Sequence, residues 1–143
     1  MKKILVACDN SGASNRAVTF AAKIAVMERA KLSLVAIGEI GSSHDLQEFA
    51  RIESGTVADV LEADARLTLD HAKALAAKAG VEHVETFMAF GDVAAAILDT
   101  IKASSADVLV VGKRGRGRIA GLLLGSVSQK LAALAPCTVA IVP

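Results

Sequence analysis

The residues of this chain that could do chemistry gather in one glycine-rich segment near its C-terminal end. Gly112-Lys113-Arg114-Gly115 is followed, after nine residues, by Gly125-Ser126-Val127. Glycines let a phosphate approach the backbone closely, and the start of a helix offers unpaired N–H groups and a partial positive charge. The hydroxyl of Ser126 and the basic side chains can add hydrogen bonds. The segment therefore predicts a phosphate-binding loop.

The distribution of charge supports an anion site in this segment. The formal net charge of the 143 residues is +1, so composition predicts neither nucleic-acid nor membrane binding. After Asp107, however, the chain has five basic residues and no acidic one. The simpler alternative is a surface loop whose glycines only turn the chain and whose charges are solvated, and the one-sided charge disfavours it.

Two familiar phosphate motifs do not fit the segment. A Walker A loop needs Lys-Ser/Thr after its second glycine, but Gly117 is followed by Arg118-Ile119. Residues 115–120 match the Gly-x-Gly-x-x-Ala form of dinucleotide-binding loops, although they do not directly follow a predicted strand. No acidic residue comes later in the chain to hold a ribose, so NAD binding is disfavoured.

The elements that must position this loop alternate between strands and helices. Short apolar runs predict buried strands at Ile4–Cys8, Leu32–Ile37, Val84–Phe90, Asp107–Val111 and Thr138–Val142. Helical spacing predicts a first helix carrying Ala17, Phe20, Ala21, Ile24 and Ala25, and further helices at Thr56–Ala79, Val93–Ala103 and Ser126–Ala135. Ser11 and Asp92 fit N-caps, and Gly80 fits a helix stop.

This alternation predicts an α/β fold with a parallel sheet and helices on both faces. Residues 39–56 lose the periodicity, with one helical turn at most around 45–51, and no linker marks a second domain, so we expect 1–143 to form one domain. Hydrophobic residues make up 53% of the chain, which is typical of a globular protein.

Cysteine usage and the start of the chain indicate a reduced cytoplasmic protein. Cys8 and Cys137 lie in apolar runs without metal-type spacing and are predicted to be small buried hydrophobic residues. The apolar run after Met1-Lys2-Lys3 is shorter than the roughly 7–15 residues of a signal-peptide core. No run reaches the roughly 18 apolar residues of a membrane span.

Taken together, these motifs resemble the universal stress protein family, and the similarity extends along the whole chain. The resemblance rests on Gly112-x2-Gly115-x9-Gly125-Ser126, Ile4–Asp9 with Ser11 and Ser14, Gly91-Asp92, Asp107–Gly112, and Gly125–Ser128 leading to Ala135-Pro136-Cys137. It implies a Rossmann-like five-stranded sheet in the order 3-2-1-4-5, of the adenine nucleotide alpha hydrolase-like type. It further implies binding of ATP with Mg²⁺ or another divalent cation, and a cytoplasmic role in stress response.

The resemblance also implies which residues form the site. Ala7, Asp9 and Ala36 would lie along adenine and ribose, with Val111 and Gly112 beside them, whereas Gly115, Gly125, Ser126 and Val127 would hold the phosphates. In a doubly wound sheet ligands bind where the winding reverses, here between strands 1 and 4, whose ends carry Asp9 and Gly112. Val35–Gly38 departs from the His-Val-x-Asp type of ending common after strand 2, which would loosen the adenine contacts.

The sequence identifies no general base or nucleophile, so we expect slow ATP hydrolysis at most. The histidines are scattered on polar segments and suggest no metal site. Alternatives are a family member that binds another adenine nucleotide such as cyclic AMP, or one that acts only through protein partners. An adenylating or pyrophosphatase-type enzyme would need Ser-Gly-Gly-x-Asp-Ser where this chain has Asp9-Asn10-Ser11-Gly12-Ala13-Ser14.

The last predicted strand, Thr138–Val142, carries no charge and would lie at the sheet edge. Unpaired backbone groups at such an edge favour pairing with another chain. We therefore expect a homodimer through this strand, in agreement with what the family resemblance implies. The alternative is a monomer in which Ser126–Ala135 shields the edge.

Overall fold

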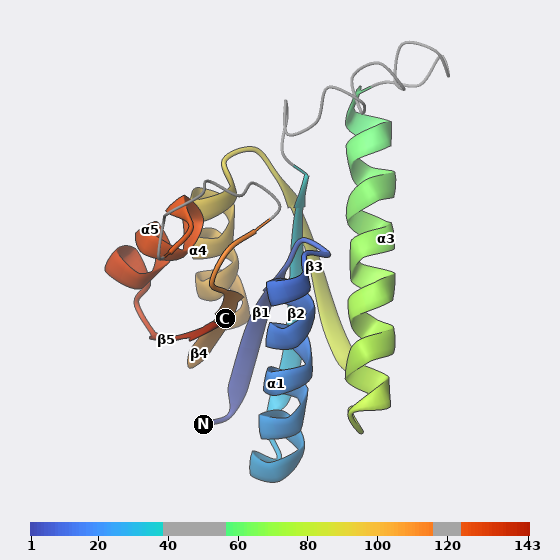
Figure 1. Ribbon diagram of the computed structural model, residues 1–143, viewed down its shortest axis with the longest axis vertical. Coiled ribbons are helices and arrows are strands. Elements are labelled where there is room, and N and C mark those ends of the chain that lie inside the picture. Colours follow the sequence, from blue (N-terminus) through green and yellow to red (C-terminus); the bar gives the residue numbers. More distant parts are fainter. Residues whose placement is uncertain (39–56, 116–123) are drawn as a thin grey trace.

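The computed structural model describes residues 1–38, 57–115 and 124–143, which form a five-stranded parallel sheet between two layers of helices (Figure 1). The strands are β1 (Lys3–Cys8), β2 (Lys31–Gly38), β3 (Val84–Phe90), β4 (Val108–Gly112) and β5 (Thr138–Val142). Their order in the sheet is β3-β2-β1-β4-β5, which confirms the predicted fold class and strand order.

The helices divide between the two faces of the sheet. Helices α1 (Gly12–Glu28) and α3 (Val57–Lys78) cover one face, and α4 (Val93–Ser104) and α5 (Ser126–Leu134) cover the other (Figure 1). Alternate residues of each strand therefore enter separate cores: Val6 packs with α1 and α3, whereas Leu5 packs with α4 and α5. Both side chains are fully buried, as expected for the central strand of a parallel sheet.

The helices begin and end at the capping residues that the sequence predicts. The side chain of Ser11 accepts a hydrogen bond from Ser14 N (3.2 Å), and Asp92 Oδ2 accepts one from Ala95 N (3.0 Å). Gly80 follows α3 closely with φ +105°, a backbone conformation that side chains disfavour. These N-caps and this stop are confirmed.

One prediction of burial is wrong, and one apolar residue at helical spacing lies outside the core. Phe20 lies on α1, as predicted, but is 45% exposed, because the alanines at 17, 21 and 25 form the face that packs on the sheet. Cys137 is only half-buried, since it precedes the edge strand β5 and is covered from one side. The turn suggested around 45–51 and the basic residues Arg116 and Arg118 of the predicted loop lie outside the described residues.

Strand β5 lies at the edge of the sheet, as predicted, and its side chains from Val139 onward are half-buried. Pairing of this edge with a second copy stays a prediction. Among residues 1–38, 57–115 and 124–143, we find no helix with the length and hydropathy of a membrane span.

Candidate functional site

A cavity of about 420 Å³ opens at the carboxyl edge of the sheet, where β1 and β4 lie side by side. After β1 the chain passes to α1 on one face, and after β4 it continues to α5 on the other, so this is the point where the winding reverses. All nine residues predicted for the site line this cavity: Ala7, Asp9, Ala36, Val111, Gly112, Gly115, Gly125, Ser126 and Val127.

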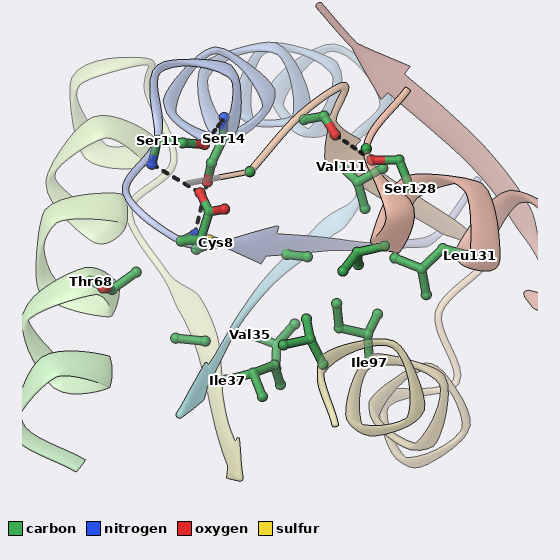
Figure 2. A pocket seen from close by; sticks show the side chains of 18 of the residues that line it. Cys8, Ser11, Ser14, Val35, Ile37, Thr68, Ile97, Val111, Ser128 and Leu131 are labelled. Atoms are coloured by element: carbon green, nitrogen blue, oxygen red, sulfur yellow. Dashed lines mark hydrogen bonds between the residues drawn. The ribbon is translucent and has the colours of Figure 1, made fainter. Parts of the chain in front are cut away.

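The wall formed by the end of β1 is held by hydrogen bonds between its own residues. Asp9 Oδ1 accepts from Ser11 N (2.9 Å), and Asp9 N donates to Ser14 Oγ (3.1 Å). Ser14 is buried, although it is polar, and this bond accounts for part of its hydrogen-bonding capacity. This network fixes the carboxylate of Asp9 at the start of α1, where Ser11 and Ser14 lie beside each other (Figure 2).

The wall formed by the end of β4 is tied to α5. Ser128 Oγ donates to the carbonyl oxygen of Gly112 (2.8 Å), and Gly125 N donates to that of Lys113 (2.9 Å). Gly125 is the N-cap of α5 and provides no side-chain hydrogen bond to the first turn. The N–H groups of that turn therefore lie beside the cavity without the cap that Ser11 supplies to α1, an arrangement that attracts anions.

Gly112, Gly115 and Gly125, the glycines of the loop that the structure describes, have different surroundings. A Cβ on Gly112 would lie 2.9 Å from Ala13 C and from Ser14 N, so the close approach of α1 requires glycine there. A Cβ on Gly115 would lie 2.6 Å from Asp9 Oδ2. A Cβ on Gly125 would meet only Lys113 O at 3.4 Å and more distant atoms, so the protein itself leaves space at this position.

The part of the cavity on the α4 and α5 face is apolar. Val35, Ile37, Ile97, Val111 and Leu131 gather there from two helices and two strands (Figure 2). Such a surface, with a few polar groups beside it, is typical of small-molecule sites.

The part on the α1 and α3 face is more polar, and it includes two residues that the sequence did not single out, Asp64 and Thr68 of α3. Arg114, a basic residue of the predicted loop, also lines the cavity. Thr68 points from α3 toward the cavity (Figure 2). The sequence shows Thr68 as a polar residue at the helical spacing of Leu61, Ala65 and Leu69, but it does not show that Thr68 reaches the cavity.

Burial and, as the smaller cause, the neighbouring charge of Asp9 raise the pKa of the Cys8 thiol to about 12. The thiol therefore stays protonated and is a poor nucleophile at neutral pH. In the described part of the chain we find no group of three or more His, Cys, Asp or Glu side chains placed to hold a metal ion.

A doubly wound sheet with a glycine-lined cavity at its switch point defines a small α/β protein with a Rossmann-like fold. The profile of the universal stress protein family matches residues 1–143, and the chain belongs to this family.

Known relatives cover nearly the whole chain. It is 32% identical over 145 residues to universal stress protein YxiE of Bacillus subtilis, covering 98% of this chain and 97% of the relative. Universal stress protein UspA from Lactobacillus plantarum has a similar fold, with a TM-score of 0.80 at 24% identity over 99% of this chain and 97% of that one. A universal stress protein crystallised in complex with cyclic AMP is 30% identical, with a TM-score of 0.76 and 99% and 97% coverage.

Proposed function

We propose that this chain binds an adenine nucleotide in the cavity, with ATP and Mg²⁺ as the first candidate, and acts as a cytoplasmic regulator in stress response. The observation that carries the proposal is the start of α5, which lacks a side-chain cap and lines the cavity together with Gly115 and Gly125. Phosphate groups supply the negative charge that such a helix start favours.

The remaining residues fit the rest of a nucleotide. Gly115, Gly125, Ser126 and Val127 would hold the phosphates, whereas Ala7, Asp9, Ala36, Val111 and Gly112 would lie along ribose and base. Mg²⁺ neutralises phosphate charge and is commonly held by phosphate oxygens and one or two carboxylates. Asp9, whose Oδ2 would lie 2.6 Å from a Cβ on Gly115, is the carboxylate among the predicted site residues and would make that contact.

Cyclic AMP is the second candidate, because a relative with 30% identity was crystallised with it. Among the described residues that line the cavity, Arg114 carries the positive charge, whereas Asp9 and Asp64 are acidic. A ligand with one negative charge meets less repulsion from this net negative lining than ATP does, and ATP needs Mg²⁺ to offset its charge.

Isothermal titration calorimetry with ATP in the presence and absence of Mg²⁺, and with ADP, AMP and cyclic AMP, tests the proposal. We expect Gly125→Val to abolish binding, because its side chain would enter space that the protein leaves open for the ligand. Ala132→Val, on an exposed part of α5 outside the cavity, is the matched control and should bind normally. Absence of heat and of a thermal shift with all these nucleotides would refute nucleotide binding.

The proposed regulator works as a homodimer through Thr138–Val142. The position of β5 at the sheet edge supports this assembly, since its outer backbone groups have no neighbouring strand among the described residues. Side chains of β5 such as Val139 and Ile141 are half-buried in one copy and would be covered further by a second.

A further inference from the structure

One polar residue interrupts the buried face of α3. Leu61, Ala65, Leu69, Ala72 and Ala76 of this face are apolar, but Thr68 stands among them with 5% exposure. An apolar residue would pack there at lower cost, because a buried hydroxyl must be hydrogen-bonded. A hydroxyl has one donor and two acceptor positions, so it can bind a ligand atom in addition to a protein partner.

The position of Thr68 along α3 brings it to the cavity. Leu61 packs near Gly38, where a Cβ on the glycine would lie 3.2 Å from Leu61 Cβ, so the first turns of α3 cover the carboxyl end of β2. Asp64 and Thr68 follow at a spacing of four residues and both line the cavity beside Ala36. Asp64 is only half-buried, whereas Thr68 points toward the cavity interior (Figure 2).

This polar pair lies at the opposite end of the cavity from the proposed phosphate site. The start of α5 follows β4, whereas α3 covers β2, and β1 separates these two strands in the sheet. Two strand spacings amount to about 10 Å. A mononucleotide whose phosphate lies at α5 therefore extends its base toward Asp64 and Thr68.

We propose that Asp64 and Thr68 determine which purine this chain accepts. The carboxylate of Asp64 accepts a hydrogen bond from the 6-amino group of adenine, and the Thr68 hydroxyl donates to a ring nitrogen. Hypoxanthine and guanine carry a carbonyl oxygen at position 6, which would face the carboxylate as a second acceptor. This inference rests on the proposed nucleotide binding and adds the residues that distinguish adenine from other purine bases.

The test compares nucleotides that share their phosphates and differ in the base. Affinities for ATP and ITP with Mg²⁺, and for cyclic AMP and cyclic IMP, are measured by calorimetry on the full chain. Whichever of these two pairs of nucleotides the unaltered protein binds, we expect its affinity for the adenine nucleotide to be at least about tenfold higher than for the hypoxanthine nucleotide. Asp64→Asn, whose amide can donate to the carbonyl, should reduce this preference to about threefold or less, and Thr68→Val should weaken binding of the adenine nucleotide by about tenfold.

Asp70→Asn, on an exposed part of the same helix, should leave both affinities unchanged. Thermal melts confirm that each variant is folded, and the ratio of affinities does not depend on the folded fraction. An unchanged preference in Asp64→Asn together with unchanged affinity in Thr68→Val would overturn the inference and leave nucleotide binding intact. Absence of binding to every nucleotide by the unaltered protein would overturn both.

Discussion

Replacing Gly112 by alanine should destabilise the fold, although this glycine belongs to the predicted nucleotide loop. The added Cβ would lie 2.9 Å from three atoms of α1, namely Ala13 C, Ala13 Cβ and Ser14 N. Two of these are backbone atoms that no change of rotamer can move. The start of α1 is itself fixed, because Ser14 N and Ser14 Oγ bond to Ser11 and Asp9.

The cost follows from the displacement that the methyl group requires. Ordinary contacts begin near 3.4 Å, so α1 must move by about half an ångström or break its capping bonds. Overpacking of this kind costs about 1–3 kcal/mol. For a domain of this size, 2 kcal/mol corresponds to a fall in Tm of roughly 5–10 °C.

Urea unfolding followed by circular dichroism, together with thermal melts, measures the effect without any ligand. Gly125→Ala is the matched control: its Cβ meets only Lys113 O at 3.4 Å and more distant atoms, and its φ of −68° suits alanine. We expect the control to lose about 1 kcal/mol or less, toward the lower end of the range of about 0.5–2 kcal/mol that alanine at an N-cap costs. A Tm for Gly112→Ala within about 2 °C of the unaltered protein would show that α1 yields easily and that the packing argument is wrong.

In Cys137→Ala, the remaining thiol of Cys8 should react with Ellman's reagent at pH 8 only after unfolding, since burial raises its pKa to about 12; rapid reaction of the folded protein would contradict this. Hydrogen bonds from Lys2 N and Lys3 N lower the pKa of Asp107 from its usual value of 3.8. The ionised carboxylate therefore stabilises the folded state above pH 3.8, and this stabilisation is lost as the pH falls through the lowered pKa. Asp107→Asn should therefore be less stable than the unaltered protein at pH 7, with a difference that shrinks toward pH 3 in urea titrations; a constant difference would count against the assignment. Phosphate release from ATP should be far below the roughly 1–1,000 per second of dedicated enzymes, and release at several per second that is lost in Asp9→Ala would reveal a catalytic carboxylate. Light scattering at micromolar concentration should show a dimer that Ile141→Lys dissociates; a mass near 14.7 kDa for the unaltered chain would exclude the dimer, and a dimer that survives the substitution would place the interface elsewhere.

Local chemistry made much of the fold predictable. Val84–Phe90 and Thr138–Val142 are the observed strands to the residue, and other boundaries differ by about one residue. Ser11 and Asp92 cap helices because a short polar side chain can reach the backbone N–H groups of its own first turn. Strands alternating with helices then restrict the topology, since crossovers between parallel strands follow one hand.

The family resemblance picked out the predicted residues of the cavity, most of which lie at the ends of β1 and β4 and at the start of α5, with Ala36 on β2. Parallel strands bring such ends to one edge of the sheet, and all nine residues do line one cavity. Their roles toward a ligand remain predictions.

Only the tertiary structure decided which residues pack against others far along the chain. It shows that Gly112 makes room for α1, that Phe20 faces outward while neighbouring alanines pack on the sheet, and that Thr68 reaches the cavity from α3. No local pattern contains this information, because it depends on how closely two elements approach and how a helix is rotated on the sheet. Those distances are set by the complementary shapes of side chains from separate elements, and they exist only once the chain has folded.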